Sequence, residues 1–249
     1  MPVELVTLTA PMILIAYAVF GATGFGSAAI AVPLLVQALP LRQAVPLVVL
    51  LDLVCTAVVG LSNWRQVSVR ELGHLLPWML LGIAAGTTLL DQVGARWPLM
   101  ALGVFVLYVG LRNLRVSAAA AVKPMAGYWA LPFGLVGGVF GALFGTGGPI
   151  YTIYLSRRLP DLERFRATIS VVILLGGISR AAAFGAAGLY GRDGLLPLAL
   201  ALLPVALLGV FIGARLRTRV SPAMLKRLIA LLLAAGGVGA FLRGWASPA

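Results

Sequence analysis

The chain has 249 residues, of which 61% are hydrophobic and only 10% are charged, and its mean hydropathy is +1.04. Soluble domains carry roughly a quarter charged residues, so this composition excludes an ordinary soluble protein. The net charge of +12 does not indicate nucleic-acid binding, because the basic residues lie in short connections between apolar runs. With one cysteine and one histidine the sequence offers no metal-ligand cluster, and we expect neither a metal nor another cofactor.

Apolar segments of membrane-spanning length recur from one end of the sequence to the other. About 20 helical residues cross a hydrocarbon layer about 30 Å thick, so the pattern predicts an all-α polytopic transmembrane bundle of about 8–10 segments. The first segment has no basic residue before it, unlike a signal peptide, and we interpret it as a retained span. In chain order the expected segments are 3–21, 26–39 (short), 44–62, 73–90, 97–114, 125–143, 147–156 (short), 168–189, 194–214 and 222–242.

Two parts of the sequence resemble each other, which predicts an internal duplication. The motif P-x-x-L-L-G-x-x-x-G occurs at 77–86 and again at 204–213, and each copy follows a glycine-rich segment. Residues 1–114 would then form a first membrane repeat and residues 125–249 a second, joined by a more polar linker at 115–124. The glycines of the shared motif also suit close helix packing in lipid, and we favour that role for them.

The distribution of basic residues favours ten crossings over eight. If the two short segments cross the membrane, one side collects 14 arginines and lysines and the other collects 4; if they are re-entrant, the split is 11 to 7. Because basic residues concentrate in cytoplasmic loops, ten crossings with both termini outside the cytoplasm fit better. Five crossings per repeat would place the two halves in opposite orientations, an arrangement typical of secondary transporters.

Each repeat begins with an apolar segment that glycines interrupt. Glycine allows a helix to stop and restart within a few residues, and a restarted helix presents unpaired N–H groups and a partial positive charge. The two breaks therefore predict an anion site, with Ser27 or Thr146 as helix caps and Pro149 in a first helical turn. The alternative is a tight turn between helices that needs glycine for packing. The candidate substrate-binding residues are Gly24, Phe25, Gly26, Ser27, Gly145, Thr146, Gly147 and Gly148.

Two ionisable residues, Asp52 and Arg180, lie well inside expected spans. Charges within a membrane are costly and normally face a cavity or a partner. The forked guanidinium of Arg180 suits an oxyanion, which makes this residue a further candidate for substrate binding, and Asp52 is a candidate proton-coupling group. A plain buried ion pair between the two residues is the alternative.

The second short segment carries more hydroxyl groups than the first. If these groups line the substrate path, the cavity is asymmetric. If they lie near the membrane surface, the tyrosines are ordinary interfacial residues. The residues concerned are Tyr151, Thr152, Tyr154 and Ser156.

Two motifs lie near the starts of the halves, GFGSAAIAVPLL in the first and GTGGPIYTIYL in the second. They resemble the TauE/SafE family, whose members are sulfite or organosulfur-anion exporters and permeases of the bacterial inner membrane, and the resemblance covers essentially the whole chain. It implies a multi-pass inner-membrane transporter of small anions. Tyr154 stands where Pro33 stands in the first motif, so symmetric roles are not implied. By position the resemblance points to Gly24, Gly26, Pro33, Gly145, Gly147 and Gly148.

These observations lead us to expect a secondary transporter of a small anion, sulfite or an organosulfonate, that works by alternating access, with proton coupling as a further hypothesis. The expected partners are the anion, the lipid bilayer and a coupling proton; a homo-oligomer is compatible with the sequence, and nucleic acid is not expected. A passive anion channel and a non-transporting membrane scaffold or assembly factor are the alternatives. An enzyme is not expected, because one histidine and two intramembrane charges form no nucleophile–base arrangement.

Overall fold

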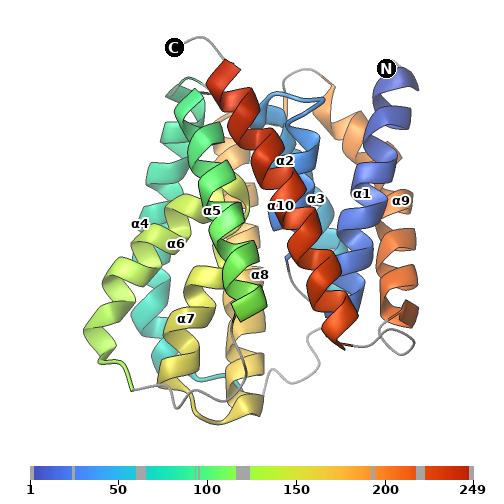
Figure 1. The fold of residues 1–249 in the computed structure, drawn as a ribbon. Coiled ribbons are helices and arrows are strands. Elements are labelled where there is room, and N and C mark those ends of the chain that lie inside the picture. Colours follow the sequence, from blue (N-terminus) through green and yellow to red (C-terminus); the bar gives the residue numbers. More distant parts are fainter. Residues whose placement is uncertain are drawn as a thin grey trace.

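The computed structural model describes residues 3–23, 26–59, 66–92, 94, 96–115, 124–191, 194–216 and 222–246, and over these residues the fold is a bundle of α-helices (Figure 1). Most of the expected linker, 116–123, lies outside the described residues. The helices are α1 (Val3–Thr23), α2 (Ser27–Leu35), α3 (Leu41–Val59), α4 (Val69–Gln92), α5 (Arg96–Arg115), the short 3₁₀ turn η2 (Gly127–Trp129), α6 (Ala130–Phe144), α7 (Gly148–Arg158), α8 (Leu162–Ala186), α9 (Leu195–Leu216) and α10 (Pro222–Ala246).

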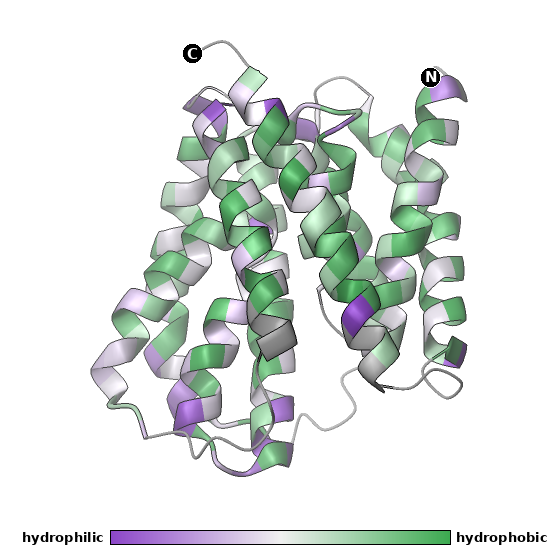
Figure 2. Cartoon of the chain, in the orientation of Figure 1, coloured by the Kyte–Doolittle hydropathy of each residue, from purple (hydrophilic) through white to green (hydrophobic). Residues whose placement is uncertain are grey.

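Within the described part of the chain, seven helical segments are long and apolar enough to cross a membrane. They are α1, α3, α4, η2 with α6, α8, α9 and α10. Helix α5 carries a shorter apolar stretch at 96–111, and α2 and α7 are short, with 9 and 11 residues. Figure 2 shows apolar residues along most of each helix and hydrophilic residues concentrated toward the helix ends. The predicted polytopic helical membrane fold is therefore confirmed.

Three helix pairs make the most extensive contacts: α1 with α9, α4 with α6, and α5 with α10. Glycine allows these backbones to approach closely. A Cβ atom added at Gly209 would lie 2.8 Å from the carbonyl oxygen of Leu14, and one added at Gly86 would lie 2.8 Å from the Cβ atom of Ala142. Both glycines belong to the motif shared by the two halves, so the packing role predicted for that motif is confirmed.

The same glycine contacts establish the directions of the paired helices. Residue numbers increase together along α1 and α9 and along α4 and α6, so these pairs are parallel, whereas α5 and α10 are antiparallel. Successive helices from α1 to α10 alternate in direction when the short helices α2 and α7 are counted, and both termini lie at the same end of the bundle (Figure 1). These directions require the chain to reverse at α2 and again at α7. The contacts are Gly209–Leu14 and Gly213–Ala18, Gly82–Leu135 and Gly86–Val139, and Gly103–Phe241 and Gly110–Leu233.

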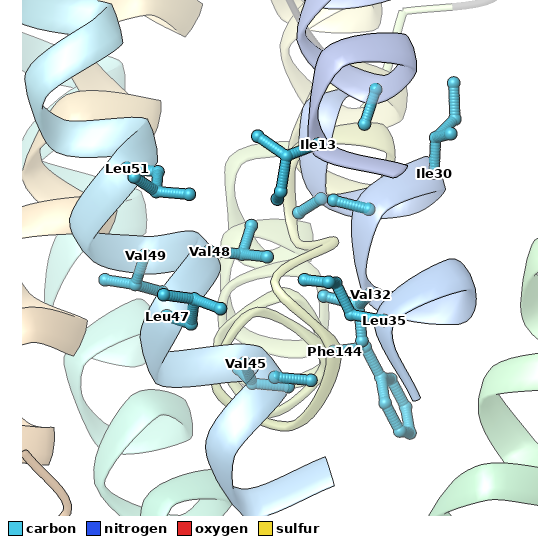
Figure 3. Close-up of a cluster of buried hydrophobic side chains, with 14 of the residues drawn as sticks. Ile13, Ile30, Val32, Leu35, Val45, Leu47, Val48, Val49, Leu51 and Phe144 are labelled. Carbon is cyan, nitrogen blue, oxygen red and sulfur yellow. The ribbon is translucent and has the colours of Figure 1, made fainter. Parts of the chain in front are cut away.

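The main hydrophobic core includes the packed faces of α1, α2 and α3 and the end of α6 (Figure 3). Ile13, Val32, Val48 and Phe144 are almost completely buried there. Because Phe144 is the last residue of α6, this core fixes the end of α6 against α2. The core therefore brings the two helix breaks of the chain together.

Replacing Gly213 with alanine tests the α1–α9 contact. The added methyl group would overlap the carbonyl oxygen of Ala18 and lie 2.9 Å from the nitrogen of Ala22, so the two backbones would have to separate. We expect the free energy of unfolding to fall by about 1–3 kcal/mol, measured as a lower thermal unfolding temperature in detergent. Gly73→Ala is the matched control, because its added methyl group meets no atom within 4 Å. Equal losses of stability in the two variants would contradict this packing.

Candidate functional site

The two glycine-rich breaks lie beside each other in the fold. The break between α1 and α2 contains Gly26, with φ 91°, and the break between α6 and α7 contains Gly145, with φ 71°. Both angles fall in the left-handed region that favours glycine. A Cβ atom added at Gly145 would lie 2.7 Å from the Cβ atom of Ala28, so the second break touches α2. Gly24 and Phe25, two of the predicted site residues, lie outside the described residues.

The predicted helix caps do not form as expected. A glycine occupies the N-cap position of both α2 and α7, and a glycine has no side chain with which to cap. Ser27 is instead the first residue of α2, and its hydroxyl group donates to Asp52. The hydroxyl group of Thr146 is buried and has no hydrogen-bond partner among the described residues. Pro149 lies in the first turn of α7, as predicted.

Asp52 lies at the N-terminal end of α2 and links the first three helices. Its Oδ1 atom accepts hydrogen bonds from the Tyr17 hydroxyl group on α1 and from the Ser27 hydroxyl group on α2, each 2.7 Å long. The Tyr17 hydroxyl group also lies 3.3 Å from the carbonyl oxygen of Val48. The partial positive charge of a helix N-terminus stabilises a carboxylate in this place. The N-terminus of α2 thus already has an anionic group of the chain itself beside it, the Asp52 carboxylate.

Arg180, on α8, lies at the second break and is only 7% exposed. Its Nη1 atom donates to the carbonyl oxygen of Gly141 in the last turn of α6, and its Nε atom donates to the carbonyl oxygen of Gly176, each over 3.1 Å. The partial negative charge of the α6 C-terminus favours a cation here. The Nη2 atom donates to none of the described residues.

Asp52 and Arg180 do not bond to each other. Of the described residues, those that bond to the Asp52 carboxylate are Tyr17 and Ser27, and the bonds of Arg180 go to backbone carbonyl oxygens. The two charges are nevertheless near enough to interact electrostatically. The two side chains therefore form no direct ion pair in this structure.

The start of α7 adds further hydrogen-bond donors beside Arg180. A Cβ atom added at Gly141 would lie 3.7 Å from Cδ of Arg180 and 3.9 Å from Cα of Gly147, so the guanidinium side chain and the helix start flank the same point. The backbone N–H groups of Gly147 and Gly148 precede the first helical hydrogen bonds of α7, and they donate to none of the described residues. A helix N-terminus beside a guanidinium group is an arrangement that binds anions.

Two tyrosines that the sequence pattern did not indicate, Tyr17 and Tyr190, also lie in this region. Tyr17 bonds to Asp52, and Tyr190, in the turn after α8, lies close enough to Arg180 to interact with its charge. The one available signal was a tyrosine in an otherwise apolar span, because a buried tyrosine hydroxyl group usually has a polar partner.

The hydroxyl-rich helix α7 divides into a buried and an exposed face. Tyr151 and Tyr154 are buried, so they are not interfacial residues exposed to lipid headgroups. Thr152 and Ser156 are exposed and bond to carbonyl oxygens of their own helix. The buried face therefore connects the helix start to the packed interior of the bundle.

An ion pair anchors the far end of α7 to the start of α4. Nη2 of Arg158 lies 2.6 Å from a carboxylate oxygen of Glu71, and the Tyr154 hydroxyl group donates to the same carboxylate over 2.8 Å. Nη1 of Arg158 donates to the carbonyl oxygen of Met125 over 3.0 Å. Because the side chain of Glu71 is only 6% exposed, its charge depends on these bonds.

Arg158→Ala should destabilise the protein, because it leaves the buried Glu71 carboxylate without its cation. We expect the free energy of unfolding to fall by about 2–3 kcal/mol, measured by thermal unfolding in detergent. Arg157→Ala removes an adjacent arginine whose side chain is exposed, and it should change stability very little. A stability loss in Arg157→Ala as large as that in Arg158→Ala would rule out the proposed anchor.

Comparison with known proteins identifies the family to which the chain belongs. The profile of the family described as "Sulfite exporter TauE/SafE" matches residues 9–240. The "Probable inner membrane transporter protein TsaS" of Comamonas testosteroni is 36% identical over 199 residues, which cover 80% of this chain and 83% of the relative. No solved structure matches the chain significantly. The resemblance drawn from the two glycine motifs is confirmed, and the chain belongs to the TauE/SafE family of membrane transporters.

Proposed function

We propose that the chain is a secondary transporter of the bacterial inner membrane that moves a small oxyanion, sulfite or an organosulfonate, by alternating access. The observation that carries this proposal is the position of Arg180. Its guanidinium group is buried beside the N–H groups at the start of α7, and within the described part of the chain no carboxylate bonds to it and those N–H groups have no acceptor. A charge in this position is costly without an anion, so the site favours an anionic ligand.

The proposal includes two halves, 1–114 and 125–249, in opposite orientations. In chain order α1 corresponds to α6, α4 to α9, and α5 to α10. The pairs α1–α9 and α6–α4 are then equivalent, and both are parallel, whereas α5 packs antiparallel to its own counterpart α10. These relations support a two-fold axis in the membrane plane. In transporters built this way, the substrate binds between the halves, where the two breaks of this chain meet.

Proton coupling through Asp52 is a further part of the proposal. The carboxylate lies within electrostatic reach of Arg180, and hydroxyl groups of α1 and α2 hold it in place. An anion that binds to Arg180 would reduce the positive potential at Asp52. Proton uptake by Asp52 would then accompany anion binding and would link the two movements.

Transport in proteoliposomes tests the function. Wild-type protein should accumulate sulfite or sulfoacetate against a concentration gradient when a pH gradient is imposed, and it should move sulfate and chloride more slowly. Arg180→Ala should lower the flux at least about tenfold, because a charged hydrogen-bond donor to the anion is lost. Arg166→Ala, an exposed arginine on the same helix, is the control and should transport normally.

Three results would count against this function. Normal flux in a folded Arg180→Ala protein would exclude Arg180 from the substrate site. Flux without accumulation would indicate a passive channel. Wild-type protein that moves none of the four anions would indicate a scaffold or an assembly factor.

A further inference from the structure

A tight turn holds Tyr190 against the face of α8 that carries Arg180. Gly188 is left-handed, with φ 68°, and the N–H group of Leu189 donates back to the carbonyl oxygen of Phe184 over 3.0 Å. This Schellman turn folds the chain back at the helix end. The Tyr190 ring then lies edge-on to the ring of Phe184, with the ring centroids 6.5 Å apart. Phe184 is one helical turn from Arg180 and shares its face of the helix.

Two buried hydroxyl groups have no partner among the described residues, one at the second break and one in the turn after α8. The Tyr190 hydroxyl oxygen and the Thr146 Oγ1 atom are both inaccessible and form no hydrogen bond with any residue that the structure describes. Thr146 is only 3% exposed and immediately follows Gly145. A Cβ atom on Gly145 would lie 3.7 Å from Nη1 of Arg180. Buried hydroxyl groups are nearly always paired. We therefore expect the hydrogen-bond partner of these two groups to be a molecule that is not part of the described chain.

The first break differs in this respect. There the Asp52 carboxylate already accepts the hydroxyl groups of Tyr17 and Ser27 at the start of α2. A second anion at that helix start would meet a carboxylate of like charge. Of the hydroxyl groups that the structure describes at the two breaks, the unpaired one, that of Thr146, therefore lies at the second.

We infer that each chain binds one anion, at the second break, and that the hydroxyl groups of Thr146 and Tyr190 are ligands of this anion together with the guanidinium group of Arg180. The inference rests on the proposed function and extends it to the side chains that bind the anion. Three donors from three separate elements match an anion that offers several acceptor oxygens, such as sulfite or the –SO₃ group of a sulfonate. A halide is a single accepting centre and suits donors that converge on one point, whereas an oxyanion suits donors that end at separate points. Tyr190 and Thr146 therefore determine specificity for oxyanions over chloride.

Conservative variants of the purified full-length protein test these ligands. Tyr190→Phe and Thr146→Val each remove one hydroxyl group and keep the shape of the side chain. We expect each to weaken sulfite binding about tenfold in isothermal titration, and to lower the preference for sulfite over chloride. Without sulfite their thermal unfolding temperatures should equal or exceed that of the wild type, because no bond of the protein is lost. Tyr108→Phe, an exposed tyrosine on α5, is the control and should bind sulfite normally.

The outcomes separate this inference from the proposed function. If both conservative variants bind sulfite as the wild type does while Arg180→Ala does not, the inference is wrong and the proposed function stands. A lower unfolding temperature without sulfite in both variants would show that the hydroxyl groups are structural, which also overturns the inference. Titration to two sulfite ions per chain would contradict the single site. Wild-type protein that neither binds nor transports sulfite or a sulfonate would overturn both proposals.

Discussion

Inside a lipid bilayer no water is available to pair with a backbone N–H or C=O group, so the protein must satisfy each group itself. The long helices of this chain do so along their length. At the two breaks the helical hydrogen bonds are interrupted, so other groups must pair with the backbone there. At the first break the chain supplies its own anion, Asp52, to the restarted helix. At the second break it supplies a cation, Arg180, to the helix that ends. The N–H groups at the start of the next helix donate to none of the residues that the structure describes, and the proposed function is based on this difference between the two breaks.

Close helix packing makes this arrangement possible. Glycines of α4 and α9 let these helices lie directly against α6 and α1, the two helices that end at the breaks. The core around Phe144 then presses the end of α6 against α2, so that groups from both halves form one polar cluster. Neither half contains the complete cluster: Asp52 comes from the first half and Arg180 from the second. A change in the contact between the halves would therefore alter the site directly.

Much of the fold and part of the site could be predicted from the sequence. Each helix lies near an expected apolar segment, because apolar length is set by membrane thickness. Asp52 and Arg180 stood out because charges are rare in such segments. Tyr17 and Tyr190 could not be assigned, because their roles depend on tertiary contacts. The Tyr17–Asp52 bond joins residues 35 positions apart, and the place of Tyr190 depends on a turn after the helix end. Hydropathy carries no information on either.

The central claim is that a small oxyanion binds at the second break, held by Arg180. An experimental structure of the protein with selenite, a heavier analogue of sulfite, tests this claim most directly, because anomalous scattering locates selenium without ambiguity. We predict one selenium peak per chain, within hydrogen-bonding reach of the Arg180 guanidinium group and the Thr146 hydroxyl group. A peak at the first break beside Ser27, or selenium bound only at the membrane surface, would contradict the account.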